Sequence, residues 1–191
     1  AVSRRNGWDP LRAAGAGPSI LRLACEDSAV STQAAQSRQR RCRRGDVMIS
    51  DITPVLLTYN EAANLARTLA GLSWAAEVVV VDSGSTDETL AIAAGFHNVR
   101  VVQRSFDTHA AQWNAATGES RSEWVLSLDA DYALSDELID ELKTWRPDPQ
   151  IDAYLCRFQY CLNGKPLRHG SLYPPRAVLY RRERCCYVQD G

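Results

Sequence analysis

The sequence lacks any run near the ~20 consecutive apolar residues that span a bilayer, and no signal peptide can be recognised in it. It has no Gly-x-Gly-x-x-Gly segment, because Gly84 is the only glycine in the turn after its apolar run, and it has no P-loop. These absences exclude a dinucleotide-binding domain and a P-loop nucleotide-binding domain. Its six cysteines form no Cys-x-x-Cys pair and have no histidine at zinc spacing. We therefore expect a cytoplasmic protein with reduced cysteines and no structural zinc.

Methionine is also scarce: the only one is Met48, and residue 1 is alanine. Met48 marks a change in charge, because residues 1–47 carry nine arginines against four acids, whereas acids outnumber bases in the rest. Residues 1–47 show no sustained apolar periodicity. We expect Met48 to be the natural start and residues 1–47 to be a non-native leader. A disordered basic leader and a functional targeting or binding arm are the alternatives.

Residues 48–191 are long enough for one domain, and in them short apolar runs alternate with amphipathic segments. This alternation is typical of an α/β fold with a mostly parallel sheet. A helix is expected after Asn60 as its N-cap, and another after a capping box of Ser85 and Glu88. Further helices are predicted at 109–117 and 136–145, the latter capped by Ser135. Strands are predicted at 52–58, 78–82, 99–102, 124–128, 153–162 and 177–182, with a hairpin turn at 163–164 and a basic turn after 182.

Polar side chains follow three of the predicted strands at the point where each strand ends. Two carboxylates one residue apart, Asp129 and Asp131, follow the apolar run 124–128. Thr58 and Tyr59 end the first strand, and Asp82 ends the second. The carboxyl ends of parallel strands meet at one edge of a sheet, so we expect one shared site there. Paired carboxylates can hold a hard divalent cation, and the cation can hold a diphosphate.

These strand ends resemble those of a family 2 glycosyltransferase of the GT-A fold. The resemblance runs from about residue 52 to 142 and extends loosely toward the C-terminus. It rests on the order and spacing of three motifs: Leu57-Thr58-Tyr59-Asn60-Glu61, Val80-Val81-Asp82-Ser83-Gly84-Ser85-Thr86-Asp87 and Leu126-Ser127-Leu128-Asp129-Ala130-Asp131. It implies a Rossmann-like nucleotide-diphospho-sugar transferase fold, with a mostly parallel central sheet flanked by helices. It also implies a domain incomplete at its C-terminus, because relatives continue with further helices or a membrane-associating segment.

The resemblance implies a hexosyltransferase that moves a sugar, with inversion, from a nucleoside diphosphate sugar to a glycan or lipid-linked acceptor. A UDP-sugar is the expected donor, and bacterial surface glycans such as the lipopolysaccharide core are the expected products. Asp129 and Asp131 would hold Mg²⁺ or Mn²⁺, and Asp129 would also contact ribose or sugar. The other residues expected to contact the nucleotide sugar are Thr58, Tyr59, Glu61, Asp82, Ser83 and Asn114.

For three of these residues, the sequence departs from the family pattern or allows a second interpretation. Asp82 would accept a hydrogen bond from a uracil imide, but many relatives have a second acid where this chain has Ser83. Asn114 alone is carried over from a basic-residue–Asn pair near the diphosphate, because Trp113 replaces the basic residue and fits a core-facing helix position. Glu61 suits a nucleotide contact and a helix N-terminus equally well.

An inverting transfer also needs a general base at the acceptor hydroxyl, and Asp190 is the acid best placed for this role. One competing interpretation is a truncated fragment that binds nucleotide sugar with little turnover. Another is a haloacid-dehalogenase-like phosphotransferase, but Ala133 replaces its expected Thr or Val, and Lys165 is the only lysine after Lys143. No nucleic-acid partner is expected. Peripheral association with the inner face of the cytoplasmic membrane fits the resemblance.

Overall fold

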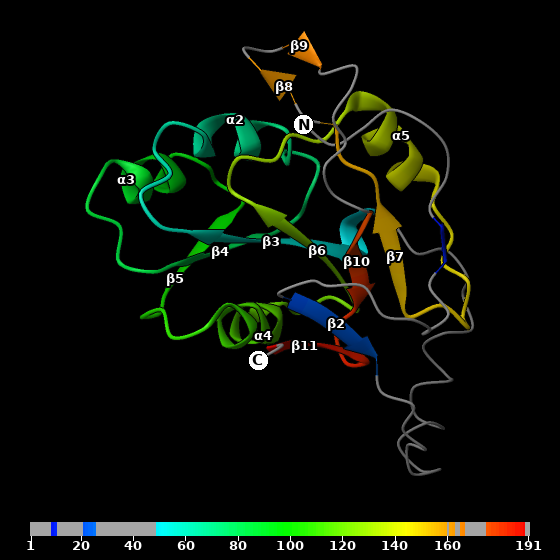
Figure 1. Cartoon of the computed structure of the whole chain (residues 1–191). Helices are drawn as coiled ribbons and strands as arrows, with labels where there is room; N and C mark the ends of the chain where they lie inside the picture. The colour runs from blue at the N-terminus through cyan, green and yellow to red at the C-terminus, as the bar shows by residue number, and fades with distance from the viewer. Residues whose placement is uncertain are drawn as a thin grey trace.

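The computed structural model describes residues 9–10, 21–25, 49–159, 161–162, 165–166 and 175–189, and its centre is a seven-stranded mixed sheet (Figure 1). In spatial order the strands are β1 (Asp9–Pro10), β7 (Ala153–Cys156), β10 (Arg176–Arg181), β6 (Trp124–Asp129), β3 (Ile52–Thr58), β4 (Val78–Asp82) and β5 (Val99–Gln103). Strands β6, β3, β4 and β5 are parallel, whereas β10 is antiparallel to both β6 and β7. Most strands therefore run in one direction, and the predicted α/β class is confirmed.

Helices cover both faces of this sheet (Figure 1). Helices α2 (Leu65–Ala70), α3 (Thr89–Ala94) and α5 (Asp136–Thr144) lie on one face, and α4 (His109–Glu119) lies on the other, beside the antiparallel pair β2 (Leu21–Cys25) and β11 (Cys185–Gln189). The short 3-10 helix η1 (Ile49–Asp51) leads into β3, and β8 (Cys161–Leu162) pairs with β9 (Lys165–Pro166). No helix in the described parts of the chain is long and apolar enough to cross a membrane.

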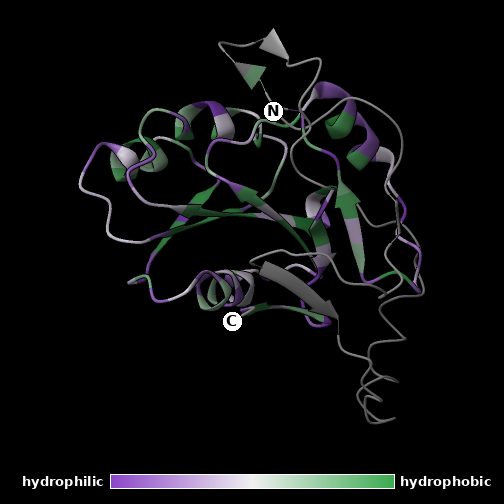
Figure 2. Ribbon diagram, viewed as in Figure 1, coloured by the Kyte–Doolittle hydropathy of each residue, from purple (hydrophilic) through white to green (hydrophobic). Residues whose placement is uncertain are grey.

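The core consists of two apolar clusters, one on each face of the sheet. In β4, Val78 and Val80 belong to the first cluster, and Val79 and Val81 belong to the second. All four are buried, because helices cover both sides of a parallel sheet. This explains why the strands read as continuous apolar runs rather than as alternating patterns, and Figure 2 shows the central strands as the most hydrophobic part of the ribbon.

Two of the predicted helix starts are wrong. Asn60 has a φ of 55° and lies in a loop, and α2 begins only at Leu65. Helix α3 begins at Thr89, and the hydroxyl of Ser85 bonds to Asp82 and the amide of Asn60 instead of capping that helix. Both polar side chains bond across to a neighbouring loop. The predicted cap at Ser135 is confirmed, since its Oγ accepts from the amide of Leu138 at 3.3 Å.

The C-terminal part of the structure also differs from the prediction. The predicted strand 153–162 is divided into β7 and β8, and β8 pairs with β9, whereas the turn expected at residues 163–164 lies outside the described residues. Strand β11 was not predicted: the basic turn ends at Arg184, and Cys185 begins the strand. Its partner β2 lies within residues 1–47, where no regular structure was expected.

The turn after β4 is built around the buried carboxylate of Asp82, which has no exposed surface. Its Oδ1 accepts hydrogen bonds from the hydroxyls of Thr58 (3.0 Å) and Ser85 (2.5 Å). Its Oδ2 accepts from the backbone amides of Gly84 and Ser85, both at 2.9 Å. Gly84 has a φ of 93°, a conformation that glycine adopts without strain. One side chain thus fixes this turn and ties it to β3.

Further hydrogen bonds join the loop after β3 to the loop after β4. Backbone amides of the first loop donate to side chains of the second: Asn60 to Ser85 (2.9 Å), Glu61 to Thr89 (2.8 Å) and Ala62 to Asp87 (3.1 Å). In return, Oδ1 of Asn60 accepts from the amide of Thr86 at 2.8 Å. The polar residues of the first two sequence motifs therefore hold each other and fix one edge of the sheet.

The division of the chain at residue 48 stays a prediction. Among the described residues, the buried members of the two apolar clusters all lie between Ile52 and Tyr187, so deletion of residues 1–47 should preserve cooperative unfolding and shift the melting temperature by only a few degrees. Differential scanning calorimetry of the full chain and of residues 48–191 measures this shift. A much larger drop would show that β2 is an integral part of the domain through its pairing with β11.

We predict that Asp82→Asn lowers the free energy of unfolding by about 3 kcal/mol at pH 7, because a buried, charged acceptor is lost. Burial alone would raise the pKa of Asp82, but the hydrogen bonds from Ser85, Gly84 and Thr58 outweigh it and hold the pKa below the usual carboxyl value. The ionised form is therefore favoured in the folded state. Its contribution is present above about pH 4 and is lost as the pH falls further.

Urea denaturation at several pH values tests this prediction, with Asp140→Asn as the matched control. Asp140 is an exposed acid paired with Lys143, and its loss should change stability by less than about 1 kcal/mol. Equal effects of the two variants, or a difference between wild type and Asp82→Asn that widens toward low pH, would contradict the assignment.

Candidate functional site

The ends of β3, β4 and β6 lie level with one another at one edge of the sheet, as expected. Thr58 pairs with Asp82 across β3 and β4, and Leu57 pairs with Asp129 across β3 and β6. The residues that directly follow these pairs, among them Tyr59 and Ser83, therefore emerge at the same edge. This is where an open α/β sheet binds ligands.

The two acids after β6 differ in exposure. Asp129 is half-buried at the end of the strand, and Asp131 is exposed in the turn that follows. The amide of Tyr132 donates to the carbonyl of Asp129 at 3.0 Å and closes this turn. Burial, followed by the charge of Asp129 and a hydrogen bond to its carboxylate, raises the pKa of the Tyr132 hydroxyl well above its usual value. Asp129 is thus held by its neighbour, whereas Asp131 faces solvent.

This acid pair fits a cation that completes its coordination with other ligands. Among the described residues there is no group of three or more His, Cys, Asp or Glu side chains that could hold a metal. Mg²⁺ is commonly bound through one or two carboxylates together with waters and substrate phosphates, rather than in a closed protein cage. Asp129 and Asp131 supply that number of carboxylates, so the residues present fit such an ion.

The nucleotide contact predicted for Asp82 stays a prediction, and in this structure its carboxylate is bonded within the chain. Asp82 has no exposed surface, and each of its oxygens already accepts two hydrogen bonds from the chain. Thr58 is also buried, and its hydroxyl donates to Asp82. The neighbouring residues are accessible instead: Tyr59 is 60% exposed and Ser83 is half-exposed. Thr58 and Asp82 therefore position this edge, and Tyr59 and Ser83 present it to solvent.

Two further residues predicted to contact the nucleotide, Asn114 and Glu61, make hydrogen bonds within the chain, and their nucleotide contacts stay predictions. The amide group of Asn114 pairs with the backbone of Tyr187, donating to its carbonyl at 2.8 Å and accepting from its N–H at 2.7 Å, so it ties β11 to α4. Trp113 is buried and stacks on the Tyr187 ring, which confirms the prediction that it faces the core. Glu61 lies four residues before α2, where its carboxylate accepts from the side chain of Asn64 at 3.2 Å. The predicted base, Asp190, lies outside the described residues.

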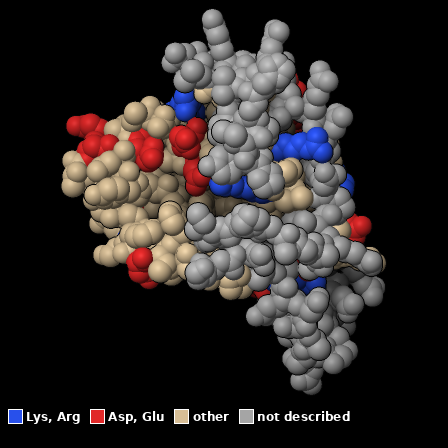
Figure 3. Space-filling model, in the orientation of Figure 1, with Lys and Arg blue, Asp and Glu red and all other residues tan. Residues whose placement is uncertain are grey.

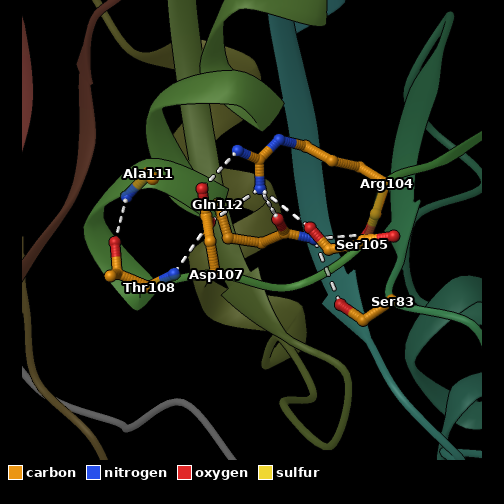
Figure 4. Close-up of polar contacts among 7 residues, drawn as sticks. All are labelled: Ser83, Arg104, Ser105, Asp107, Thr108, Ala111 and Gln112. Atoms are coloured by element: carbon orange, nitrogen blue, oxygen red, sulfur yellow. Dashed lines mark hydrogen bonds and ion pairs between the residues drawn. The ribbon is translucent and has the colours of Figure 1, made fainter.

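A polar network that the sequence analysis missed supports Ser83 (Figure 4). The fully buried amide of Gln112 donates to the Ser83 hydroxyl at 3.1 Å and to the carbonyl of Arg104 at 3.3 Å, and its oxygen accepts from the Arg104 guanidinium. Arg104 also pairs with Asp107 at 2.8 Å and holds the pKa of that carboxyl well below its usual value. The signals were the Arg-x-x-Asp spacing and Thr108, which caps α4.

Comparison with known proteins agrees with this geometry. Residues 54–187 match the sequence model of "Glycosyl transferase family 2". An "Uncharacterized glycosyltransferase" of Rickettsia bellii is 34% identical over 58% of this chain and 37% of its own length. The "Lipopolysaccharide core biosynthesis glycosyltransferase LpsC" of Rhizobium meliloti is 31% identical over 48% of this chain and 36% of its own length. The chain thus spans little more than a third of the curated relatives it matches.

Comparison with solved structures finds likenesses over part of the chain. A crystal structure of S. aureus TarS residues 1–349 is 27% identical, with a TM-score of 0.43 over 47% of this chain and 30% of that one. The "Mannosyltransferase PcManGT from Pyrobaculum calidifontis in complex with GDP-Man and Mn2+" is 27% identical, with a TM-score of 0.46 over 62% of this chain and 40% of that one. The family match leaves the phosphotransferase alternative without support. The chain belongs to glycosyl transferase family 2.

Proposed function

We propose that this chain forms the donor-binding part of a metal-dependent enzyme that transfers a sugar from a nucleoside diphosphate sugar. The observation that carries the proposal is the pair Asp129 and Asp131 at the end of β6, level with the ends of β3 and β4 in a family 2 domain. A buried strand holds the first acid, and a short turn leaves the second exposed. This arrangement offers carboxylates to a cation at the edge where a nucleotide binds.

Each accessible residue at this edge has a distinct role in the proposal. The exposed ring of Tyr59 provides an apolar face for the base, and Ser83 provides a hydroxyl beside it. Asp129 and Asp131 would hold Mg²⁺ or Mn²⁺. When bound, this ion would neutralise the charge that develops on the leaving diphosphate. Asp190, outside the described residues, is the proposed general base for an inverting transfer.

The charge of the surface supports a role for a cation. On the face shown in Figure 3, most visible acidic side chains lie at the left, around α3, with basic atoms near α2 beside them, and the other visible basic side chains lie nearer the centre and right. Helices α2 and α3 follow β3 and β4, two of the three strands whose ends form the donor edge. An anionic diphosphate would be repelled by acids at this edge unless a divalent cation lay between them.

The proposed donor is a UDP-sugar and the proposed acceptor a glycan or lipid-linked precursor. The names of two relatives support this acceptor class: the lipopolysaccharide core glycosyltransferase LpsC and the "Succinoglycan biosynthesis protein ExoO", both of Rhizobium meliloti. A lipid-linked acceptor would bring the protein to the inner face of the cytoplasmic membrane.

Asp131→Asn should abolish metal-stimulated hydrolysis of the donor, lowering the rate at least about tenfold, because the exposed carboxylate contributes to cation binding. Stability should change by less than about 1 kcal/mol, since the side chain is exposed. The measurement is the initial rate of donor hydrolysis in Mn²⁺ and in EDTA. Asp136→Asn, which replaces another exposed acid in the first turn of α5, is the matched control and should retain the wild-type rate.

Two outcomes would contradict these assignments. An equal wild-type rate in Mn²⁺ and in EDTA would overturn the metal dependence. The companion variant Asp190→Asn should bind nucleotide like the wild type but fail to transfer sugar to an acceptor, and transfer that survives this change would place the base elsewhere.

A further inference from the structure

Two consecutive residues of α2 hold the backbone of the turn that carries the acid pair. The hydroxyl of Thr68 donates to the carbonyl of Ala130 at 2.7 Å, and Thr68 is only 1% exposed. The guanidinium of Arg67, on the exposed side of the same helix, donates to the carbonyl of Asp131 at 3.1 Å. The middle and last residues of Asp-x-Asp are therefore both anchored to one helix.

The sheet topology places α2 beside this turn. Strands β3 and β6 are parallel neighbours, so the helix that follows β3 packs near the carboxyl end of β6. Leu65 and Leu69 of α2 belong to the same apolar cluster as Leu128 and Ala130, which fixes the helix against the strand end. The anchor at Thr68 thus rests on a packed core and not on a mobile surface loop.

These contacts set the direction in which the Asp131 side chain leaves the backbone. Rotation of the peptide that joins Ala130 to Asp131 would break the bond from Thr68 and leave a buried carbonyl without its partner. The bond from Arg67 restrains the next peptide in the same way. Tyr132 closes the turn from the other side through the carbonyl of Asp129. A weakly held carboxylate pair would have to be ordered by the cation itself, at a cost in affinity.

We propose that Thr68 and Arg67 are positioning residues that orient the carboxylates of Asp129 and Asp131 for a divalent cation. This inference rests on the proposed function of the acid pair. Thr68 is the buried anchor, and Arg67 is the exposed one. Neither side chain binds the cation: both act through the backbone of the turn, as ligand-supporting groups do in other metal sites.

The test uses Thr68→Val, which keeps the shape of the side chain and removes the hydroxyl. Thr68→Ser keeps the hydroxyl and serves as the rescue variant. Thr117→Val is the matched control, because it removes another buried threonine hydroxyl, bonded to Tyr180 at 2.8 Å. In the absence of metal and nucleotide, amide hydrogen exchange at 130–132 should be faster in Thr68→Val only.

Binding of Mn²⁺ in the presence of UDP, and separately of GDP, provides the second readout, by electron paramagnetic resonance of the free ion. Thr68→Val should raise the Kd for Mn²⁺ at least fivefold, whereas Thr68→Ser and Thr117→Val should stay close to the wild type. Unchanged exchange at 130–132, or an unchanged Kd, in Thr68→Val would overturn the inference. Absence of Mn²⁺ binding to the wild type with either nucleotide would overturn the proposed metal site, and the inference with it.

If Thr68→Val fails to fold, Arg67→Met provides a second test, because Arg67 is exposed and its replacement should not affect folding. Removal of a positive charge near a cation site would by electrostatics alone tighten cation binding. Loss of a positioning contact predicts the opposite, a Kd for Mn²⁺ raised at least twofold. A lower or equal Kd in Arg67→Met would contradict the role assigned to it.

Discussion

The geometry of the site depends on the hydrogen bonds that the buried carboxylate of Asp82 accepts. This carboxylate joins the end of β3 to the turn after β4, and the other bonds between the two loops extend from the same turn. A buried charge is tolerated only when its hydrogen bonds are satisfied, and here four donors from this chain surround it. Because β3 also pairs with β6, a fixed end of β3 supports the position of the turn that carries the acid pair.

The acids of the motifs have different tasks, which the structure separates by exposure and hydrogen bonding. Asp82 and Asp87 bind backbone amides and hydroxyls of the two interlocked loops, and these bonds keep the pKa of each below the usual carboxyl value. Asp131, in contrast, presents its carboxylate to solvent from a turn held by α2. Different carboxylates at one edge of the sheet thus stabilise the fold and face solvent. We infer that the exposed carboxylate, that of Asp131, binds the cation.

Much of the fold could be predicted from the sequence, because β3, β4 and β6 are apolar runs that a doubly covered parallel sheet requires. The caps expected at Asn60 and Ser85 failed since these side chains bond to the adjacent loop, and sequence spacing does not reveal which loops lie side by side. Sequence spacing also does not reveal the burial of Asp82. Its position at the end of a strand is typical of a ligand-binding residue, and only the tertiary structure shows that its carboxylate is buried.

The most direct test of the account is a thermal-shift and hydrolysis screen of the full chain across nucleoside diphosphate sugars, each with Mn²⁺ and with EDTA. We predict that at least one donor raises the melting temperature and is hydrolysed in Mn²⁺, and that EDTA removes both effects. A donor effect of equal size in EDTA, or no effect of any donor in Mn²⁺, would contradict the claim that the acid pair after β6 binds a cation and, through it, a nucleoside diphosphate sugar.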